Sequence, residues 1–303
     1  MSTTAAPVSL TAKDYKTDLH PIWCPGCGDF GVLNAIHRAL AALQVLPEEL
    51  VLVSGIGCSS RAPHFVNAYG FHTVHGRALP IATGVKQARP ELEVIAIGGD
   101  GDFFAIGMGH LPHAARRNPD ITCIIMDNEI YGLTKGQASP TSSLRLVTGS
   151  TPYELVDQPV NPIALSIVSG ATFVARGYSG KPKELADLIQ LGIEHKGFSV
   201  LQIISPCVTF HNIFEATKAG VRPLPEGHDP SDKAGAIKAA IEGNGMEVGI
   251  FYREQRPTLE DGIASQKLRA QGAPPARRSD MSALVPSVVR DDAFVVKPRM
   301  PSK

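Results

Sequence analysis

The sequence EVIAIGGDGD, residues 93–102, joins a run of apolar residues directly to a segment of glycine and aspartate. The apolar run 93–97 predicts a buried strand, and GGDGD predicts a loop, followed by a helix that continues to about Arg117. The next apolar run, ITCIIM at 121–126, predicts a second strand that also ends in polar residues. In open α/β sheets, ligands bind beside the loops at the carboxyl edge. We therefore expect the functional groups of this chain at that edge.

Working outward from this stretch, apolar runs alternate with helical patterns along the chain. This alternation is typical of βαβ units and predicts an α/β fold with a mostly parallel sheet. Asn161 and Pro162 predict the capped start of one further helix. The other expected elements are helices 29–43, 81–88 and 181–194 and strands 50–53, 172–175 and 198–204. Together they predict one α/β domain over residues 1–207.

Residues 208–303 are expected to form a C-terminal extension that is partly irregular. One helix, 232–242, and one strand, 248–252, are indicated there. From 265 to 303 the chain is rich in Pro, Ala, Ser and Arg and has no sustained period. We expect this tail to pack on a partner subunit.

The composition excludes several classes of protein. The 303 residues are 43% hydrophobic and 19% charged, with a formal net charge of zero, so there is no electrostatic footprint for nucleic acid or an anionic membrane. The first residues lack the apolar core of a signal peptide, and no apolar stretch is long enough to span a bilayer. We expect a cytoplasmic protein.

The two loops after the predicted strands offer oxygen ligands and backbone donors. Glycines in GGDGD let the backbone approach a phosphate, and the following helix directs its N-terminal N–H groups toward it. Asp100 suits Mg²⁺, a hard cation that binds carboxylate, amide and carbonyl oxygens together with substrate phosphates. The second loop adds the amide oxygen of Asn128 and nearby carbonyls. The pattern predicts a site for Mg²⁺ and a diphosphate.

The five cysteines lie at positions 24, 27, 58, 123 and 207. An odd number in a chain without an export signal argues against a disulfide framework. Cys123 lies inside ITCIIM and is expected to be an inert core residue. The other thiolates suit tetrahedral Zn²⁺ or an iron–sulfur cluster, and the pair in Cys24-Pro-Gly-Cys27 also suits a redox dithiol. Spacing alone leaves these alternatives open.

A family resemblance indicates which groups the phosphate site and the cysteine site bind. Gly-Asp-Gly after one strand and Asn after the next form the thiamine diphosphate motif. GGDGDFFAIG (98–107), DNEIYGLTKGQ (127–137) and HGRA (75–78) resemble segments of the β subunits of 2-oxoacid:ferredoxin oxidoreductases. The resemblance implies that Mg²⁺ is held by Asp100, Asn128 and the Ile130 carbonyl. The residues that it places around the cofactor are Ile56, Gly57, Cys58, His75, Gly76, Arg77, Gly99, Asp100, Gly101, Asp102, Asn128, Ile130, Tyr131, Gly132 and Leu133.

The same resemblance extends to the cysteines. CPGCG (24–28), GIGCSSR (55–61) and SPC (205–207) resemble the segments that hold the [4Fe–4S] cluster of this family. It implies that Cys24, Cys27, Cys58 and Cys207 bind one such cluster. The compact cysteine run of bacterial ferredoxins is missing, so any further cluster of the enzyme belongs to another chain.

The resemblance implies an enzyme that reversibly decarboxylates a 2-oxoacid, transfers the acyl group to coenzyme A and passes electrons through the cluster to ferredoxin. Enzymes of this kind also need a pyrimidine-binding domain, which one α/β domain and a tail do not supply. We therefore expect activity only with an α subunit. The alternatives are a non-redox thiamine decarboxylase subunit with zinc on its cysteines, and an electron-transfer subunit whose phosphate loop is vestigial.

Two further residues are candidates for substrate recognition. Lys135, in the loop after Asn128, resembles a residue of the 2-oxoglutarate-using members, whereas glycine there resembles pyruvate users. A lysine charge suits the second carboxylate of 2-oxoglutarate, so we expect that substrate, with pyruvate or broad specificity as the alternative. Arg61 is a candidate for binding the anionic coenzyme A. For both residues, the alternative is an ordinary solvent-exposed or structural side chain without a role in binding. The direction of reaction and the choice between αβ and α₂β₂ stay open.

Overall fold

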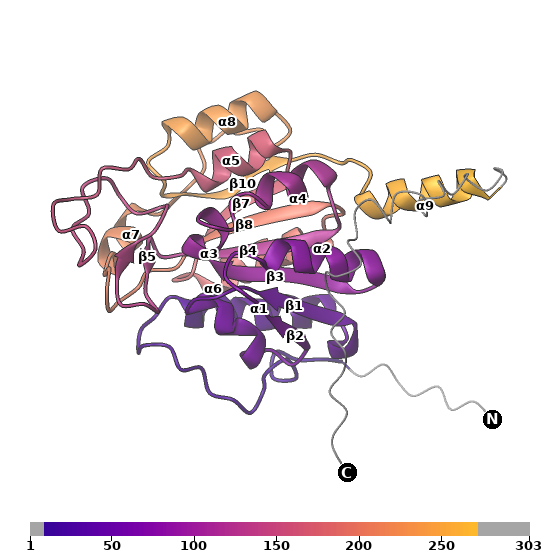
Figure 1. Cartoon of the computed structure of the whole chain (residues 1–303), viewed down its shortest axis with the longest axis horizontal. Helices are drawn as coiled ribbons and strands as arrows, with labels where there is room; N and C mark the ends of the chain where they lie inside the picture. Colours follow the sequence, from indigo (N-terminus) through magenta and orange to yellow (C-terminus); the bar gives the residue numbers. More distant parts are fainter. Residues whose placement is uncertain (1–8, 272–303) are drawn as a thin grey trace, which may run out of the picture. The chain divides into compact units, whose positions relative to one another are not determined.

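The structure, a computed structural model, describes residues 9–271, and within them an eight-stranded sheet organises the fold (Figure 1). Its strands lie in the order β2-β1-β3-β4-β8-β7-β10-β9. All neighbours run parallel except β10, which is antiparallel to β7. The strands are β1 (Leu50–Ser54), β2 (Tyr69–His72), β3 (Glu93–Gly99), β4 (Ile121–Asp127), β7 (Phe173–Tyr178), β8 (Phe198–Ile204), β9 (Arg222–Pro223) and β10 (Glu247–Arg253). The predicted α/β class with a mostly parallel sheet is confirmed.

Two layers of helices enclose the sheet. On one face lie α1 (Asp29–Leu43), α6 (Pro182–Glu194) and the 3₁₀ helix η2 (Ser59–Phe65), and on the other α2 (Ala78–Ala88), α4 (Leu111–Arg117), α5 (Pro162–Ser169) and α8 (Lys233–Glu242). The central strands alternate between the two cores. In β4, for example, Cys123 and Ile125 face one core while Ile124 and Met126 face the other. Burial on both faces explains why these strands are continuous apolar runs.

Local signals set several helix ends. The Asn161 side chain accepts the N–H of Ala164, 3.0 Å away, and caps α5, which then starts with Pro162 and ends at the left-handed Gly170. This is the predicted capped start. Helix α1 has the bounds predicted from the sequence and ends where Gln44 turns left-handed.

The segment GGDGD differs from the predicted loop. Gly98 and Gly99 complete β3, and Asp100 opens a short helix, α3 (Asp100–Phe104). The expected single helix to Arg117 is also wrong, because turns separate α3 from α4. Gly107 and Gly109 lie in that interval, and glycine is a poor helix former.

Residues beyond Cys207 add more regular structure than was predicted. They contribute β9 and β10 to the sheet, a short helix α7 (Phe214–Gly220) and a helix α9 (Leu259–Ala270). The chain divides into two compact units, 1–263 and 264–303, so β10 belongs with the sheet of the first. No regular structure was expected from residue 265 onward. That prediction is wrong for residues 265–270, which belong to helix α9. The rest of the expected tail, 272–303, lies outside the described residues.

Helix α9 escaped prediction because it has no buried residue and therefore no apolar period. Its start is marked by a reciprocal cap: Asp261 accepts the N–H of Thr258, and the Thr258 hydroxyl accepts the N–H of Asp261. Across residues 9–271, the helices are all too short or too polar to cross a bilayer. The cytoplasmic location stays a prediction.

Candidate functional site

The order of the strands brings the sequence motifs together. β1, β3, β4 and β8 are consecutive in the sheet and parallel, so their carboxyl ends lie side by side. These ends lead into the segments GIGC (55–58), DGD (100–102), DNEIYG (127–132) and SPC (205–207). Motifs separated by up to about half of the chain therefore form one region of the carboxyl edge, as expected for an open α/β sheet.

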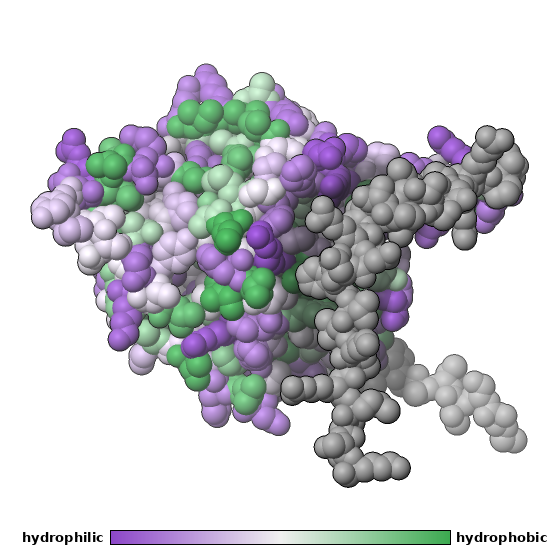
Figure 2. All heavy atoms as spheres, viewed as in Figure 1, coloured by the Kyte–Doolittle hydropathy of each residue, from purple (hydrophilic) through white to green (hydrophobic). Residues whose placement is uncertain are grey.

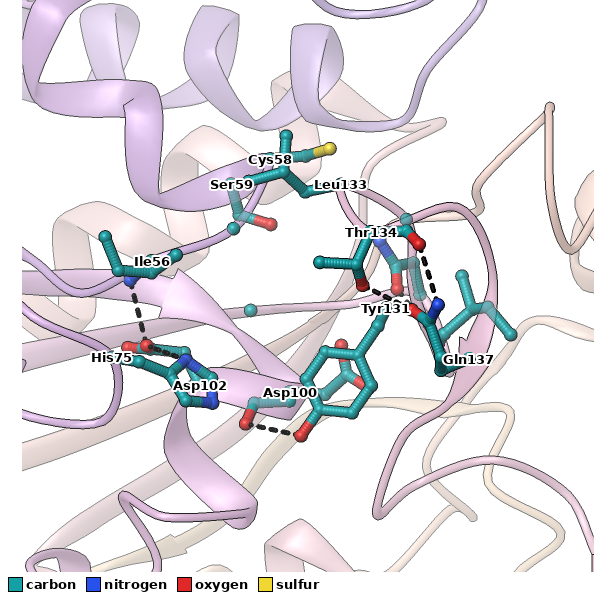
Figure 3. Close-up of a pocket in the computed structure, with 16 residues that line it drawn as sticks. Ile56, Cys58, Ser59, His75, Asp100, Asp102, Tyr131, Leu133, Thr134 and Gln137 are labelled. Atoms are coloured by element: carbon teal, nitrogen blue, oxygen red, sulfur yellow. Dashed lines mark hydrogen bonds and ion pairs between the residues drawn. The ribbon is translucent and has the colours of Figure 1, made fainter. Parts of the chain in front are cut away.

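A pocket of about 460 Å³ lies at this edge. Figure 3 shows its lining residues pointing into a shared space between the loop at 56–59 and the segment 131–137. The pocket is lined by Ile56, Gly57, Cys58, Ser59, His75, Gly99, Asp100, Gly101, Asp102, Asn128, Ile130, Tyr131, Gly132, Leu133, Thr134 and Gln137. Of the residues predicted around the cofactor, all but Gly76 and Arg77 are in this set. Ser59, Thr134 and Gln137 were missed: they lie within the quoted segments GIGCSSR and DNEIYGLTKGQ, but the resemblance assigned them no role.

Asp102 joins three segments around the pocket. Its Oδ1 accepts the backbone N–H of Ile56 at 2.9 Å, that of Gly76 at 2.8 Å, and lies 3.0 Å from Nδ1 of His75. Burial raises the pKa of Asp102, and these donors oppose the shift. Gly76 thus acts through its backbone. The other oxygen, Oδ2, is buried without a hydrogen-bond partner among the described residues.

The Arg77 side chain is directed away from the pocket. Its guanidinium makes a short contact with Nε2 of His110 and does not line the cavity. The structure therefore assigns Arg77 a contact with the segment before α4 and gives it no place in the pocket wall.

Two glycines shape the pocket wall, Gly101 by allowing the Tyr131 ring to pack against it and Gly57 by bordering open space. A Cβ on Gly101 would lie 2.2 Å from the ring of Tyr131, whose hydroxyl donates to the Gly101 carbonyl at 3.2 Å. Gly57 has φ +137°, and a Cβ there would meet nothing within 4 Å, so its backbone borders open space. Together with the start of α3 beside it, this opening fits a phosphate group.

The expected magnesium ligands adjoin one another. Asp100 is only 1% exposed, and its Oδ2 accepts hydrogen bonds from the hydroxyls of Ser139 and Thr141. Burial and the nearby Asp127 carboxylate raise the pKa of Asp100. The amide oxygen of Asn128 accepts the N–H of Ile130 at 3.0 Å. Carboxylate, amide and carbonyl oxygens are the donor set that suits Mg²⁺.

The four expected cluster cysteines lie on segments that meet in the same region. A Cβ on Gly132 would lie 3.7 Å from Sγ of Cys207 and 3.8 Å from Sγ of Cys58, so both sulfurs adjoin the pocket wall. The CPGCG segment is held against SPC because the N–H of Gly28 donates to the Pro206 carbonyl at 3.2 Å. Burial raises the pKa of Cys58 to about 11 and that of Cys27 further, with added repulsion from the Asp29 carboxylate.

The four thiols form a donor set of the kind that binds an iron–sulfur cluster. In residues 9–271, no three His, Cys, Asp or Glu side chains converge on a single metal ion. Cysteines around a [4Fe–4S] cluster each bind a different iron, so their sulfurs lie farther apart than the ligands of one ion. Cys123 is fully buried in β4, as predicted for a core residue.

The two candidates for substrate recognition lie outside the pocket wall. Lys135 is exposed at the turn between β5 (Ile130–Tyr131) and β6 (Gln137–Ala138), with φ +75°, while its neighbour Thr134 lines the cavity. Arg61 lies in η2, close enough to Cys58 for its positive charge to oppose the rise that burial causes in the pKa of that thiol.

Comparison with known proteins agrees with this geometry. Residues 55–203 match the family described as "Thiamine pyrophosphate enzyme, C-terminal TPP binding domain". Residues 207–267 match the family of the C-terminal region of the pyruvate ferredoxin oxidoreductase beta chain. The fold and the site thus define a thiamine diphosphate-binding domain of an enzyme.

Similarity to individual proteins indicates the enzyme family more narrowly than the domain match does. The chain is 45% identical to 2-oxoacid:ferredoxin oxidoreductase 1, subunit beta, of Aeropyrum pernix, over 85% of this chain and 86% of the relative. It is 36% identical to the 2-oxoglutarate oxidoreductase subunit KorB of Mycobacterium tuberculosis, over 90% and 86%. A 2-oxoglutarate:ferredoxin oxidoreductase from Magnetococcus marinus, solved with 2-oxoglutarate, coenzyme A and succinyl-CoA, superposes with a TM-score of 0.85 at 43% identity, over 93% of this chain and 97% of that one. The chain belongs to the β subunits of the 2-oxoacid:ferredoxin oxidoreductases.

Proposed function

We propose that this chain is the β subunit of an enzyme that oxidatively and reversibly decarboxylates 2-oxoglutarate to succinyl-CoA and CO₂. The observation that carries the proposal is the position of Gly132. It lines the pocket that contains Asp100 and Asn128, and it adjoins the sulfurs of Cys58 and Cys207. A cofactor in the pocket would therefore lie beside a cluster on the cysteines, which is what electron removal from a bound substrate requires.

Within the pocket, Asp100, Asn128 and the Ile130 carbonyl hold Mg²⁺, and Gly99, Gly101 and Asp102 lie around the diphosphate. Thiamine diphosphate, when bound, supplies the nucleophilic carbon and the electron sink for decarboxylation. The chain positions the cofactor. The hydroxyls of Ser139 and Thr141 donate to Asp100 and orient this metal ligand. Asp102 holds the loop at Ile56 and the backbone of Gly76 in place.

Cys24, Cys27, Cys58 and Cys207 hold the [4Fe–4S] cluster, from which ferredoxin takes the electrons. Cys24 is exposed, whereas Cys207 is buried next to the pocket. The thiol set therefore reaches from the cofactor side to the surface, which gives electrons a route out. The alternative hypothesis is a zinc ion on the same thiols of a non-redox decarboxylase. It provides no such route, because Zn²⁺ does not change its oxidation state.

The active site is completed by an α subunit, which supplies the pyrimidine-binding half. Apolar side chains support a partner at the pocket: Ile56 and Leu133 line it and are more than one third exposed, and Ile106, beside Gly76, is 55% exposed. Covering Ile56, Leu133 and Ile106 would exclude water from the cofactor. On the face that Figure 2 displays, green apolar patches lie among polar residues.

Lys135 recognises the distal carboxylate of 2-oxoglutarate, and Arg61 contributes to binding coenzyme A. The names of the relatives support the first assignment, since several are 2-oxoglutarate enzymes. Lys135 is at the turn of a hairpin, and its neighbours at 130–134 and 137 line the pocket. A closing movement of a few residues would bring its ammonium toward the substrate.

The test is to purify the native complex without oxygen and to assay 2-oxoglutarate and pyruvate with coenzyme A and a ferredoxin or viologen acceptor. We expect a brown protein that requires thiamine diphosphate and Mg²⁺ and prefers 2-oxoglutarate. Zinc in place of iron would contradict the redox assignment, and equal or greater turnover of pyruvate would contradict the substrate. Isolated β chain should be inactive until the α subunit is added.

A further inference from the structure

A chain of buried hydrogen bonds connects the expected magnesium ligand to strands on the far side of β4. Oδ2 of Asp100 and Oδ1 of Asp127 each lie 2.8 Å from the hydroxyl of Thr141. Oδ2 of Asp127 accepts the side-chain N–H of Gln202 at 2.7 Å, and the Gln202 oxygen accepts Nε–H of Arg176 at 2.8 Å. All five residues are at least nine-tenths buried.

The register of the sheet explains how these side chains meet. Arg176 of β7 pairs directly with Gln202 of β8, and Gln202 pairs with Ile125 of β4. Because side chains alternate along a strand, Asp127 lies on the same face as Ile125, one step nearer the carboxyl edge. Gln202 can therefore reach Asp127 diagonally, and Asp127 borders the loop that begins with Asn128.

Arg176 fixes which way the Gln202 amide points. A guanidinium only donates hydrogen bonds, so the amide oxygen of Gln202 must face Arg176 and the NH₂ group must face Asp127. Arg176 is itself held, since its Nη1 donates to the Glu247 carbonyl at 3.3 Å and its guanidinium lies 5.2 Å from the ring centre of Phe251. The orientation of this pair is thus built into the sheet.

Thr141 is where the chain of bonds meets the metal site. A hydroxyl has one hydrogen and can donate it to only one of the two carboxylates at a time. Asp127 already has two other donors, the Gln202 amide and the N–H of Glu129 at 3.2 Å. Asp100 also has two other donors, the Ser139 hydroxyl and the N–H of Asn128. Because the two carboxylates are equally supplied, the Gln202 donor decides whether Asp127 competes with Asp100 for the Thr141 hydrogen.

We propose that Gln202 and Arg176 are positioning residues for the magnesium site, because they keep Asp127 satisfied and so leave Thr141 to orient Asp100. The inference rests on the proposed function, in which Asp100 binds Mg²⁺. When Gln202 cannot donate, Asp127 takes the Thr141 hydrogen and Asp100 loses an orienting bond. Removal of partners that orient a metal ligand typically weakens metal affinity by about 10- to 100-fold.

The experiment measures the Kd of Mg²⁺ by calorimetry on the purified αβ complex saturated with thiamine diphosphate. Gln202→Met keeps the length of the side chain and should raise the Kd by about 10-fold. Gln202→Leu also removes the donor for Asp127, so it should raise the Kd at least as much. Ser199→Ala is the matched control: it removes another buried hydrogen bond of β8, to the Gly192 carbonyl, and should leave the Kd unchanged.

A double-mutant cycle tests the route through Thr141. In a Thr141→Val background, Gln202→Met should have no further effect on the Kd. Fold-changes that simply multiply would overturn the proposal, as would wild-type affinity in Gln202→Leu. The variant Asp100→Asn distinguishes a failure of the positioning role from a failure of the proposed magnesium site. If it abolishes Mg²⁺ binding while the Gln202 variants bind normally, the positioning role is wrong and the metal site stands; if Asp100→Asn binds normally, both are wrong.

Discussion

Oδ1 of Asp102 lies 3.0 Å from Nδ1 of His75, and the same oxygen accepts two backbone N–H groups. One carboxylate oxygen therefore holds the loop after β1 and the segment before α2 against the start of α3. The Asp102 carboxylate therefore joins segments that form the pocket wall.

We predict that Asp102→Ala destabilises the fold more than Asp102→Asn. Alanine leaves the N–H groups of Ile56 and Gly76 without an acceptor, at about 1–3 kcal/mol for each buried group, whereas asparagine retains an acceptor oxygen. The free energy of unfolding, measured by urea denaturation of both variants, checks this. Equal losses would show that the hydrogen bonds of Oδ1 do not stabilise the loop.

We predict that Gly101→Ala abolishes cofactor binding. Its Cβ would lie 2.2 Å from the Tyr131 ring, so the ring or α3 must move into the pocket. Gly84→Ala is the matched control, because that glycine lies in α2 and an added Cβ meets nothing within 4 Å. The control should bind thiamine diphosphate normally and gain about 0.5–1 kcal/mol of stability. Normal cofactor retention by Gly101→Ala would contradict the assigned pocket.

The affinity for Mg²⁺ should fall as the solution becomes acidic. Burial and the charge of Asp127 raise the pKa of Asp100, so in the metal-free chain its carboxyl keeps a proton at higher pH than an ordinary aspartate does. Mg²⁺ binds the deprotonated form and must displace that proton. Calorimetric Kd values at about pH 8 and about pH 6 should differ, with weaker binding at the lower pH.

The control for this pH dependence is Asp100→Asn. Asparagine does not titrate in this range, so any residual Mg²⁺ binding should lose most of its dependence on pH. A wild-type Kd that is the same at both pH values would show that Asp100 holds no proton in the metal-free chain.

We expect about four irons per chain in anaerobically purified protein. Replacing any of Cys24, Cys27, Cys58 or Cys207 with alanine should remove the brown absorption. Cys123→Ala should keep it, because that thiol is buried in the core of β4. Iron analysis and visible spectra check both statements. A Cys123 variant that loses iron along with the others would point to misfolding as the cause.

Lys135→Ala should lower kcat/KM for 2-oxoglutarate by about 10- to 150-fold and leave pyruvate unaffected. The factor corresponds to the loss of one charged hydrogen bond, worth about 1.5–3 kcal/mol. Lys183→Ala, at an exposed lysine of α6, controls for the change in net charge. If both substrates fall together, or neither falls, Lys135 does not bind the distal carboxylate.

Several features could be predicted from sequence because their causes are local. The apolar runs of β1, β4 and β8, the cap at Asn161 and the glycine and aspartate residues after β3 each leave a pattern within a few residues. Where that pattern is weak, prediction fails. Helix α9 buries no side chain, and β2 has no buried residue, so neither shows an apolar period.

The sequence by itself determined the fold class, the motifs around Asp100 and Asn128, and the cysteines that can bind metal. Only the tertiary structure decided which side chains hold these motifs in place: Asp102 against Ile56, Thr141 between Asp100 and Asp127, and Gln202 against Asp127. These partners lie up to 75 residues apart. Which residues meet across a sheet depends on strand order and register, and those depend on the packing of both cores. A hydrogen bond between distant residues leaves no periodic trace in the chain, so it becomes visible only when the strands are side by side.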